Sequence, residues 1–184
     1  MYAIGVLSLD TPLKRAIRDV CVGFLASFLF FFISRVSIPL FFTPVPLAVQ
    51  MNLVLLLPFF INKKRSVYAT VFFILQGALG FSVFANGSYG MSVLLGSNGG
   101  YILGYLLAAC LVGDLIERGN LTTKKAYFIM LFGNLVVWFL GGLWLSFFVG
   151  GIYKAFLLGV LPFIPGDFIK LALSIKLLKR LKKI

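Results

Sequence analysis

The sequence predicts an all-α polytopic membrane protein with six transmembrane helices and both termini in the cytoplasm. Three observations carry this prediction: the composition, the spacing of the apolar runs and the placement of the basic residues. Of the 184 residues, 61% are hydrophobic and 12% are charged, and the mean hydropathy of +1.06 exceeds what water-soluble folds tolerate. At roughly 20 residues per crossing, six helices use about 120 residues. We therefore expect residues 1–184 to form one integral membrane domain with short connections.

Charged residues and prolines divide the chain into six apolar segments. Proline removes a backbone donor and clashes with the preceding helical turn, so Pro162 and Pro165 are expected to interrupt the last segment. The predicted helices cover residues 16–33, 47–61, 67–81, 99–113 and 126–149, followed by an interrupted helix made of 152–163 and 165–178.

The basic residues set the orientation of these helices, because cytoplasmic loops retain Lys and Arg. All of them except Arg35, Lys154 and Lys170 lie at the start of the first helix, between helices two and three, between helices four and five, or at the C-terminal end. Six crossings with both termini inside place all four clusters on one side. The net charge of +12 is thus explained by topology, and no nucleic-acid partner is expected.

Two outer connections are rich in proline, glycine and small polar residues. Loop one, residues 35–46, contains three prolines, which limit its freedom and predict a semi-rigid lid. Loop two, residues 82–98, contains three glycines and no charged residue. Irregular backbone at membrane depth is tolerated only where protein or a cavity satisfies it. We therefore expect both loops to fold over the helices and cover an outward-facing cavity.

The residue inventory excludes several kinds of chemistry. The chain has no histidine and two cysteines, so metal centres and histidine-based catalytic triads are not expected. No phosphate-binding P-loop is present, so the chain itself is not expected to hydrolyse ATP. We expect neither enzymatic activity nor a cofactor. Within the first fifteen residues, no basic segment precedes the short apolar patch and no small-residue cleavage site follows it, so no signal peptide is expected.

Asp167 and Lys170 are the strongest candidates for a ligand site, because ionisable residues within membrane segments are costly and usually functional. Their spacing of three residues places them on one face of a helix, near its outer start at Pro165. The alternatives are a structural ion pair, or a lysine whose charged end extends outward to the membrane surface. A cavity with one cation and one anion suits a ligand that has a carboxylate at one end and polar groups at the other.

Other polar residues of the outer half are weaker candidates for the same cavity, since amides also cap helices and form turns. They are Gln50, Asn86, Asn98 and Tyr101.

Mid-helix polar residues and small-residue stripes are expected to join helices. Gln76, Asn134 and Trp138 fall in this class. Gly100 and Gly104 allow close packing of the fourth helix, whereas Gly23 and Ser27 could serve either the bundle or an intramembrane partner.

Three ordered motifs resemble the BioY biotin transport proteins, which are substrate-binding (S) components of energy-coupling factor (ECF) transporters. Residues 38–50 resemble the family's first outer loop, with the sequence IPLFFTPVPLAVQ. Residues 84–105 resemble its glycine-rich loop, with FANGSYGMSVLLGSNGGYILGY. Residues 161–170 resemble its last motif, with LPFIPGDFIK. Ser97 and Asn98 stand where the family usually has Pro and Thr. The resemblance implies an S-component-like helix bundle.

The resemblance also implies that Asp167 and Lys170 belong to a biotin site. Lys170 would attract the valerate carboxylate, and Asp167 would accept from the ureido N–H groups or hold Lys170 in place. Gln50, Asn86 and Tyr101 would be further contacts, and aromatic walls would enclose the rings and the thioether.

The expected function is biotin uptake across a bacterial cytoplasmic membrane, with a transmembrane coupling protein and ATPase subunits as partners. The main alternative is a solitary biotin facilitator without ATPases. An intramembrane enzyme that acts on a lipid, or a structural subunit, would be further alternatives, but no catalytic constellation accompanies Asp167 and Lys170.

Overall fold

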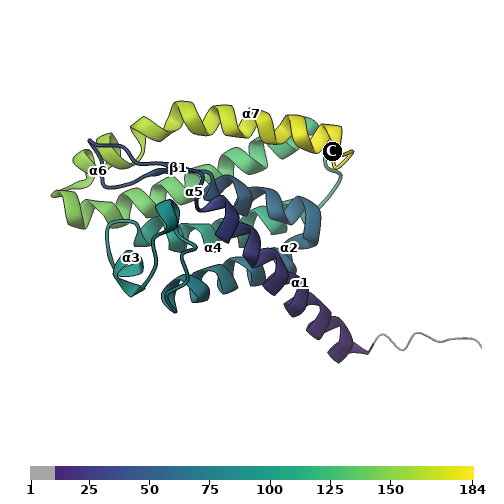
Figure 1. The fold of residues 1–184 in the computed structure, drawn as a ribbon. Coiled ribbons are helices and arrows are strands. Elements are labelled where there is room, and N and C mark those ends of the chain that lie inside the picture. The colour runs from purple at the N-terminus through teal and green to yellow at the C-terminus, as the bar shows by residue number, and fades with distance from the viewer. Residues whose placement is uncertain (1–10) are drawn as a thin grey trace, which may run out of the picture.

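The structure, a computed structural model, describes residues 11–184 as a bundle of helices (Figure 1). The expected all-α fold is confirmed, apart from two strands of two residues each. The region expected to lack a signal peptide lies mostly outside the described residues. The elements are α1 (Pro12–Ile33), β1 (Ser37–Ile38), β2 (Leu47–Ala48), α2 (Gln50–Ala78), η1 (Ala85–Gly87), α3 (Met91–Leu95), α4 (Gly99–Glu117), α5 (Thr123–Val149), α6 (Ile152–Gly159), η2 (Leu161–Phe163) and α7 (Ile164–Arg180).

Helix α2 contains two of the predicted crossings, because the chain reverses direction within it. Asn62 leaves the helical conformation with φ 67° and ψ 170°, a region of positive φ that asparagine tolerates better than most residues. Its Oδ1 accepts a hydrogen bond from the backbone N–H of Arg65 at 3.2 Å and so caps the second half. Gln50, at the start of α2, donates to the carbonyl of Val83, beyond its end. The two ends of α2 therefore lie on the same side of the bundle.

The helices account for six crossings. Within the described residues, four segments are long and apolar enough to cross a membrane by themselves: Pro12–Ile33, Gly99–Glu117, Thr123–Val149 and Ile152–Arg180. The two halves of α2 supply the other crossings. The last segment is interrupted as predicted, since α6 ends at Gly159 and Pro165 lies in the first turn of α7.

The basic clusters gather at one end of the bundle, as their spacing predicts. The start of α1 and the C-terminus lie toward this end, whereas α3 and α6 lie toward the other (Figure 1). Three contacts join the elements there: Arg65 Nε to Asp19 Oδ1 at 2.8 Å, Lys63 Nζ to Asp114 Oδ1 at 2.7 Å, and Lys183 Nζ over the ring of Phe60 at 5.7 Å from its centroid.

This arrangement predicts that Lys64 and Lys124 face the cytoplasm. In a chain whose two native cysteines are replaced by serine, Lys64→Cys and Lys124→Cys should react with a membrane-impermeant maleimide only after the cells are opened. Phe41→Cys, at the fully exposed tip of loop one, should react in intact cells and is the matched control. Labelling of position 64 or 124 only from outside would refute the topology.

Small residues let the helices pack closely. A Cβ on Gly100 would lie 2.2 Å from Cβ of Trp144 on α5, so the stripe on α4 is used for packing as expected. On α1, Gly23 and Ser27 are buried, and the hydroxyl of Ser27 accepts from Gln76 Nε2 of α2 at 2.9 Å. The stripe on α1 therefore serves the internal bundle.

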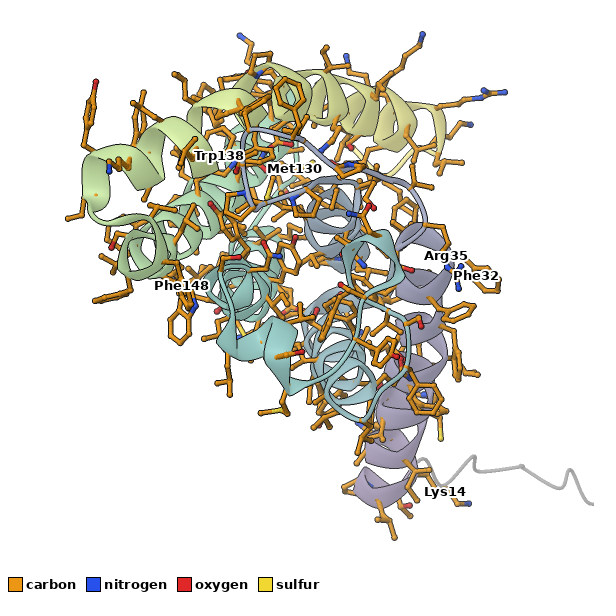
Figure 2. All side chains as sticks on the ribbon, turned by 60° about the vertical axis from the view of Figure 1, so that its left-hand side comes forward. Lys14, Phe32, Arg35, Met130, Trp138 and Phe148 are labelled. Carbon is orange, nitrogen blue, oxygen red and sulfur yellow. The ribbon has the colours of Figure 1, made fainter. Side chains whose placement is uncertain are left out.

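Large apolar side chains cover the outside of the bundle. Phe32 and Phe148 point away from the helices, whereas Met130 and Trp138 lie among them (Figure 2). An apolar surface of this kind suits contact with lipid. The chain is a multi-pass membrane protein.

Candidate functional site

A cavity lies among the outer ends of α2, α4, α5 and α7, beneath loops one and two. It contains about 600 Å³ of space between atoms, including a part that is open to solvent. Buried apolar side chains, among them Met51, Phe84 and Phe163, form much of the wall. The lining residues with polar side chains are Gln50, Ser88, Asn98, Tyr101, Tyr105, Trp138, Asp167 and Lys170.

Asp167 and Lys170 form an ion pair on the wall of this cavity. Asp167 lies in the first turn of α7, where the helix dipole favours a negative charge. Its side chain is 4% exposed, and its Oδ1 lies 2.9 Å from Nζ of Lys170, whose side chain is 15% exposed. The predicted pairing on one helical face is confirmed. Charges this well buried are stable only when they are paired and hydrogen-bonded.

Two further hydrogen bonds anchor this pair to other elements. Trp138 of α5 donates its indole N–H to Oδ2 of Asp167 at 3.0 Å, and Figure 2 shows Trp138 among the helices. Lys170 donates to the carbonyl of Ala48 in β2 at 2.9 Å. An ammonium group has three N–H donors, so Lys170 keeps one beyond its bonds to Asp167 and Ala48. The ammonium group of Lys170 is therefore held in place at the cavity wall, with one N–H donor still available for a ligand.

Tyr101 and Gln50 line the cavity, and each uses a donor within the protein. The hydroxyl of Tyr101 donates to the carbonyl of Gly159 at 2.7 Å. The amide of Gln50 donates to the carbonyl of Val83. Both side chains are buried. These bonds hold the two side chains in place as parts of the wall.

Asn98 and Asn86 lie nearer the outside. A second, more open space, here called the outer recess, adjoins the cavity and is lined by both of these residues together with Ser92 and Ser97. Asn98 lines the cavity as well, whereas Asn86 does not. Of the six predicted site residues, five therefore line the cavity, and Asn86 lies at its mouth.

Asn86 joins the two outer loops. Its Oδ1 accepts from the hydroxyl of Ser37 at 2.6 Å, and its backbone N–H donates to the same hydroxyl at 2.7 Å. Asn86 adopts a left-handed conformation with φ 58°, which asparagine tolerates. This contact connects loop one to loop two.

Two aromatic lining residues, Trp138 and Tyr105, were not among the sequence-predicted site residues. Trp138 was expected only as a contact between helices, and its bond to Asp167 follows from the packing of α5 against α7. Tyr105 could have been found, because it lies four residues after Tyr101 and therefore on the same face of α4.

Gly141 makes room for the ring of Tyr101. A Cβ at Gly141 would lie 2.2 Å from Cδ1 of that ring. We expect Gly141→Ala to lower the free energy of unfolding by about 1–3 kcal/mol through overpacking. Thermal unfolding in detergent measures the change. Gly142→Ala is the matched control, because its nearest contact is an ordinary 3.4 Å. Equal melting temperatures for the two variants would contradict the prediction.

The chain matches known proteins over nearly its whole length. The model of the BioY family matches residues 7–184. The biotin transporter BioY of Lactococcus lactis is 31% identical over 152 residues, which cover 80% of each chain. The biotin transporter BioY of Thermotoga maritima is 36% identical over 151 residues, which cover 81% of this chain and 86% of that protein.

The fold also matches a solved structure. The crystal structure of the S-component for biotin from an ECF-type ABC transporter superposes with a TM-score of 0.82 and 24% identity, covering 95% of each chain. The helix bundle described above therefore has the S-component fold.

Proposed function

This chain belongs to the BioY family, and from that premise we propose that it captures biotin from the outer side of the membrane and delivers it to the cytoplasm as the substrate-specific component of an ECF-type ABC transporter. The observation that carries the proposal is the buried pair of Asp167 and Lys170 on the wall of a cavity at the outer end of the bundle. We place the protein in the cytoplasmic membrane of a bacterium, with residues 1–184 as one transport domain.

The chemistry of biotin fits this cavity. Biotin has a carboxylate at one end, a cyclic urea at the other and a thioether ring between them. Lys170 supplies a positive charge and a donor for the carboxylate. The buried side chains of Met51, Phe84 and Phe163 supply apolar walls for the ring system. The proposed binding residues are Asp167, Lys170, Gln50, Asn98 and Tyr101 in the cavity, and Asn86 at its mouth.

Biotin is the transported substrate here and not a cofactor. The family is one of transporters, and no enzymatic activity is assigned. We propose that a separate transmembrane coupling protein and ATPase subunits complete the transporter. The solved structure with the same fold is an S-component from an ECF-type ABC transporter, which supports this proposal.

Binding of biotin to the purified full chain tests the function. In lipid nanodiscs, titration calorimetry should show saturable binding of one biotin per chain. Lipoate is the matched ligand control, because it has the same pentanoate side chain but no cyclic urea. It should bind far more weakly. Failure of biotin to bind, or equal binding of lipoate, would overturn the proposal.

Loop one has the position of a lid. Val45, Pro46 and Ala48 contribute to the cavity wall, and Ser37↔Ala48 pairing in the β1–β2 hairpin closes the base of the loop. Phe41 at its tip is fully exposed. Because Lys170 bonds to Ala48, a ligand on Lys170 would lie directly beneath this hairpin.

We therefore expect biotin to protect loop one from proteolysis. Chymotrypsin should cleave after Phe41 or Phe42 several-fold more slowly when biotin is saturating, because a ligand that packs under the hairpin disfavours local opening. Cleavage after Tyr153, at the exposed start of α6, is the internal control. Equal cleavage of loop one with and without biotin would show that the loop is a passive connection.

A further inference from the structure

Asn98 has a buried side-chain oxygen that no group of the described protein bonds. It directly precedes α4, where an asparagine side chain commonly accepts from an N–H of the first turn. Here the side chain makes no such bond, because the backbone of Asn98 is helical (φ −89°, ψ −9°) and not extended as a capping residue requires. The N–H of Tyr101, which such a cap could bind, donates to the backbone carbonyl of Asn98 at 3.1 Å. Over residues 11–184, Oδ1 of Asn98 is the one buried side-chain nitrogen or oxygen atom without a partner.

The position of this oxygen connects it to the cavity. Asn98 lines both the cavity and the outer recess, so it lies where the two spaces adjoin. A buried acceptor without a donor costs free energy. Oδ1 has almost no accessible surface, so a ligand N–H group reaches it when the Asn98 side chain turns toward the cavity, and the bond then removes that cost.

The carboxylate of the cavity is already engaged. Oδ1 of Asp167 accepts from Lys170, and Oδ2 accepts from Trp138. Through these bonds, Asp167 holds the side chain of Lys170 in place on the cavity wall. Each carboxylate oxygen can still accept a second bond, but each already has a donor, whereas Oδ1 of Asn98 has none among the described residues. A ligand N–H therefore gains most at Asn98.

We propose that Oδ1 of Asn98 accepts a hydrogen bond from one N–H of the cyclic urea of biotin and is a specificity-determining residue of this cavity. The inference rests on the proposed function. This hydrogen bond would orient biotin with its carboxylate at Lys170 and its cyclic urea toward the start of α4. The cavity then selects a ligand that carries an N–H donor opposite its carboxylate, and Asp167 acts on the ligand through Lys170.

A combined change of protein and ligand tests this contact. Affinities of the full chain in nanodiscs are measured for biotin and for its two isomers that are methylated on one or the other urea nitrogen. Asn98→Ala should lower the affinity for biotin by about 10- to 100-fold, because the urea N–H loses its acceptor. Methylation of the nitrogen that faces Asn98 should weaken binding to the unchanged chain by a similar factor. The same isomer should bind Asn98→Ala within about threefold of biotin, since the N–H has no acceptor left there and the shorter side chain leaves room for the methyl group.

A second pair of variants separates hydrogen bonding from packing. Asn98→Thr and Asn98→Val have nearly the same shape, but only threonine keeps an acceptor oxygen. Asn98→Val should bind biotin about tenfold more weakly than Asn98→Thr. Ser97→Ala, which changes the outer recess alone, is the control and should bind biotin like the unchanged chain.

The possible results are distinct. Equal biotin affinity of the Thr and Val variants would overturn the proposal, as would a folded Asn98→Ala that binds biotin as tightly as the unchanged chain. Should Asn98→Ala fail to fold, the Thr and Val pair decides. If the unchanged chain does not bind biotin, the proposed function itself fails. That result is separate from a chain that binds biotin without using Asn98.

Discussion

Lys170→Ala is expected to weaken biotin binding by about 30-fold or more, because loss of one partner of a poorly hydrated charge pair costs about 2–5 kcal/mol. Lys170 is held by Asp167 and Ala48, so its charge is in place before the ligand arrives. Biotin methyl ester lacks the carboxylate charge. It should bind the unchanged chain poorly and lose much less on the same substitution. Titration of acid and ester against both proteins in nanodiscs measures these differences.

Lys154→Ala is the matched control for this experiment. Lys154 is another basic residue of the outer half, but it lies exposed on α6 and does not line the cavity. Its substitution should leave the affinity for biotin unchanged. If Lys170→Ala lowered the affinities for biotin and for its methyl ester by the same factor, Lys170 would not contact the carboxylate, and its pair with Asp167 would be structural.

Asp167→Ala is expected to destabilise the protein by about 3–5 kcal/mol, the usual cost of leaving one member of a buried pair unpaired. The substitution removes the acceptor of both Lys170 and Trp138. Thermal unfolding in detergent measures the loss. The double variant Asp167→Ala/Lys170→Met removes the unpaired charge as well and should recover much of the melting temperature. A double variant that is no more stable than Asp167→Ala would contradict this account.

Asp167→Asn distinguishes the two roles that were open for this carboxylate. The amide keeps the shape and one oxygen but loses the negative charge. If Asp167 acts by holding Lys170, the variant should bind the acid form of biotin more weakly, and its affinity for the methyl ester should change little. If Asp167 contacts the cyclic urea, both ligands should lose affinity by a similar factor.

The sequence alone determined the helices and their order across the membrane. Hydropathy acts on each segment separately, and basic residues at the ends of a segment act on its own insertion. The interruption before α7 is equally local, because proline disrupts a helix whatever surrounds it. For the same reason Asp167 and Lys170, three residues apart on one helix, could be paired before their surroundings were known.

Only the tertiary structure decided which groups meet around that pair. Trp138 and Asp167 are 29 residues apart, and Ala48 and Lys170 are 122 apart. Their contacts depend on how α5, α7 and loop one pack, and no local pattern carries that information. The same holds for Asn98, whose type suggests a helix cap. Its side chain is left without a partner because its backbone is already helical, which is not the conformation of a capping residue, and because no donor of another element reaches it. Helix formation is governed by neighbours in sequence, whereas the bonding of a buried polar atom is governed by neighbours in space.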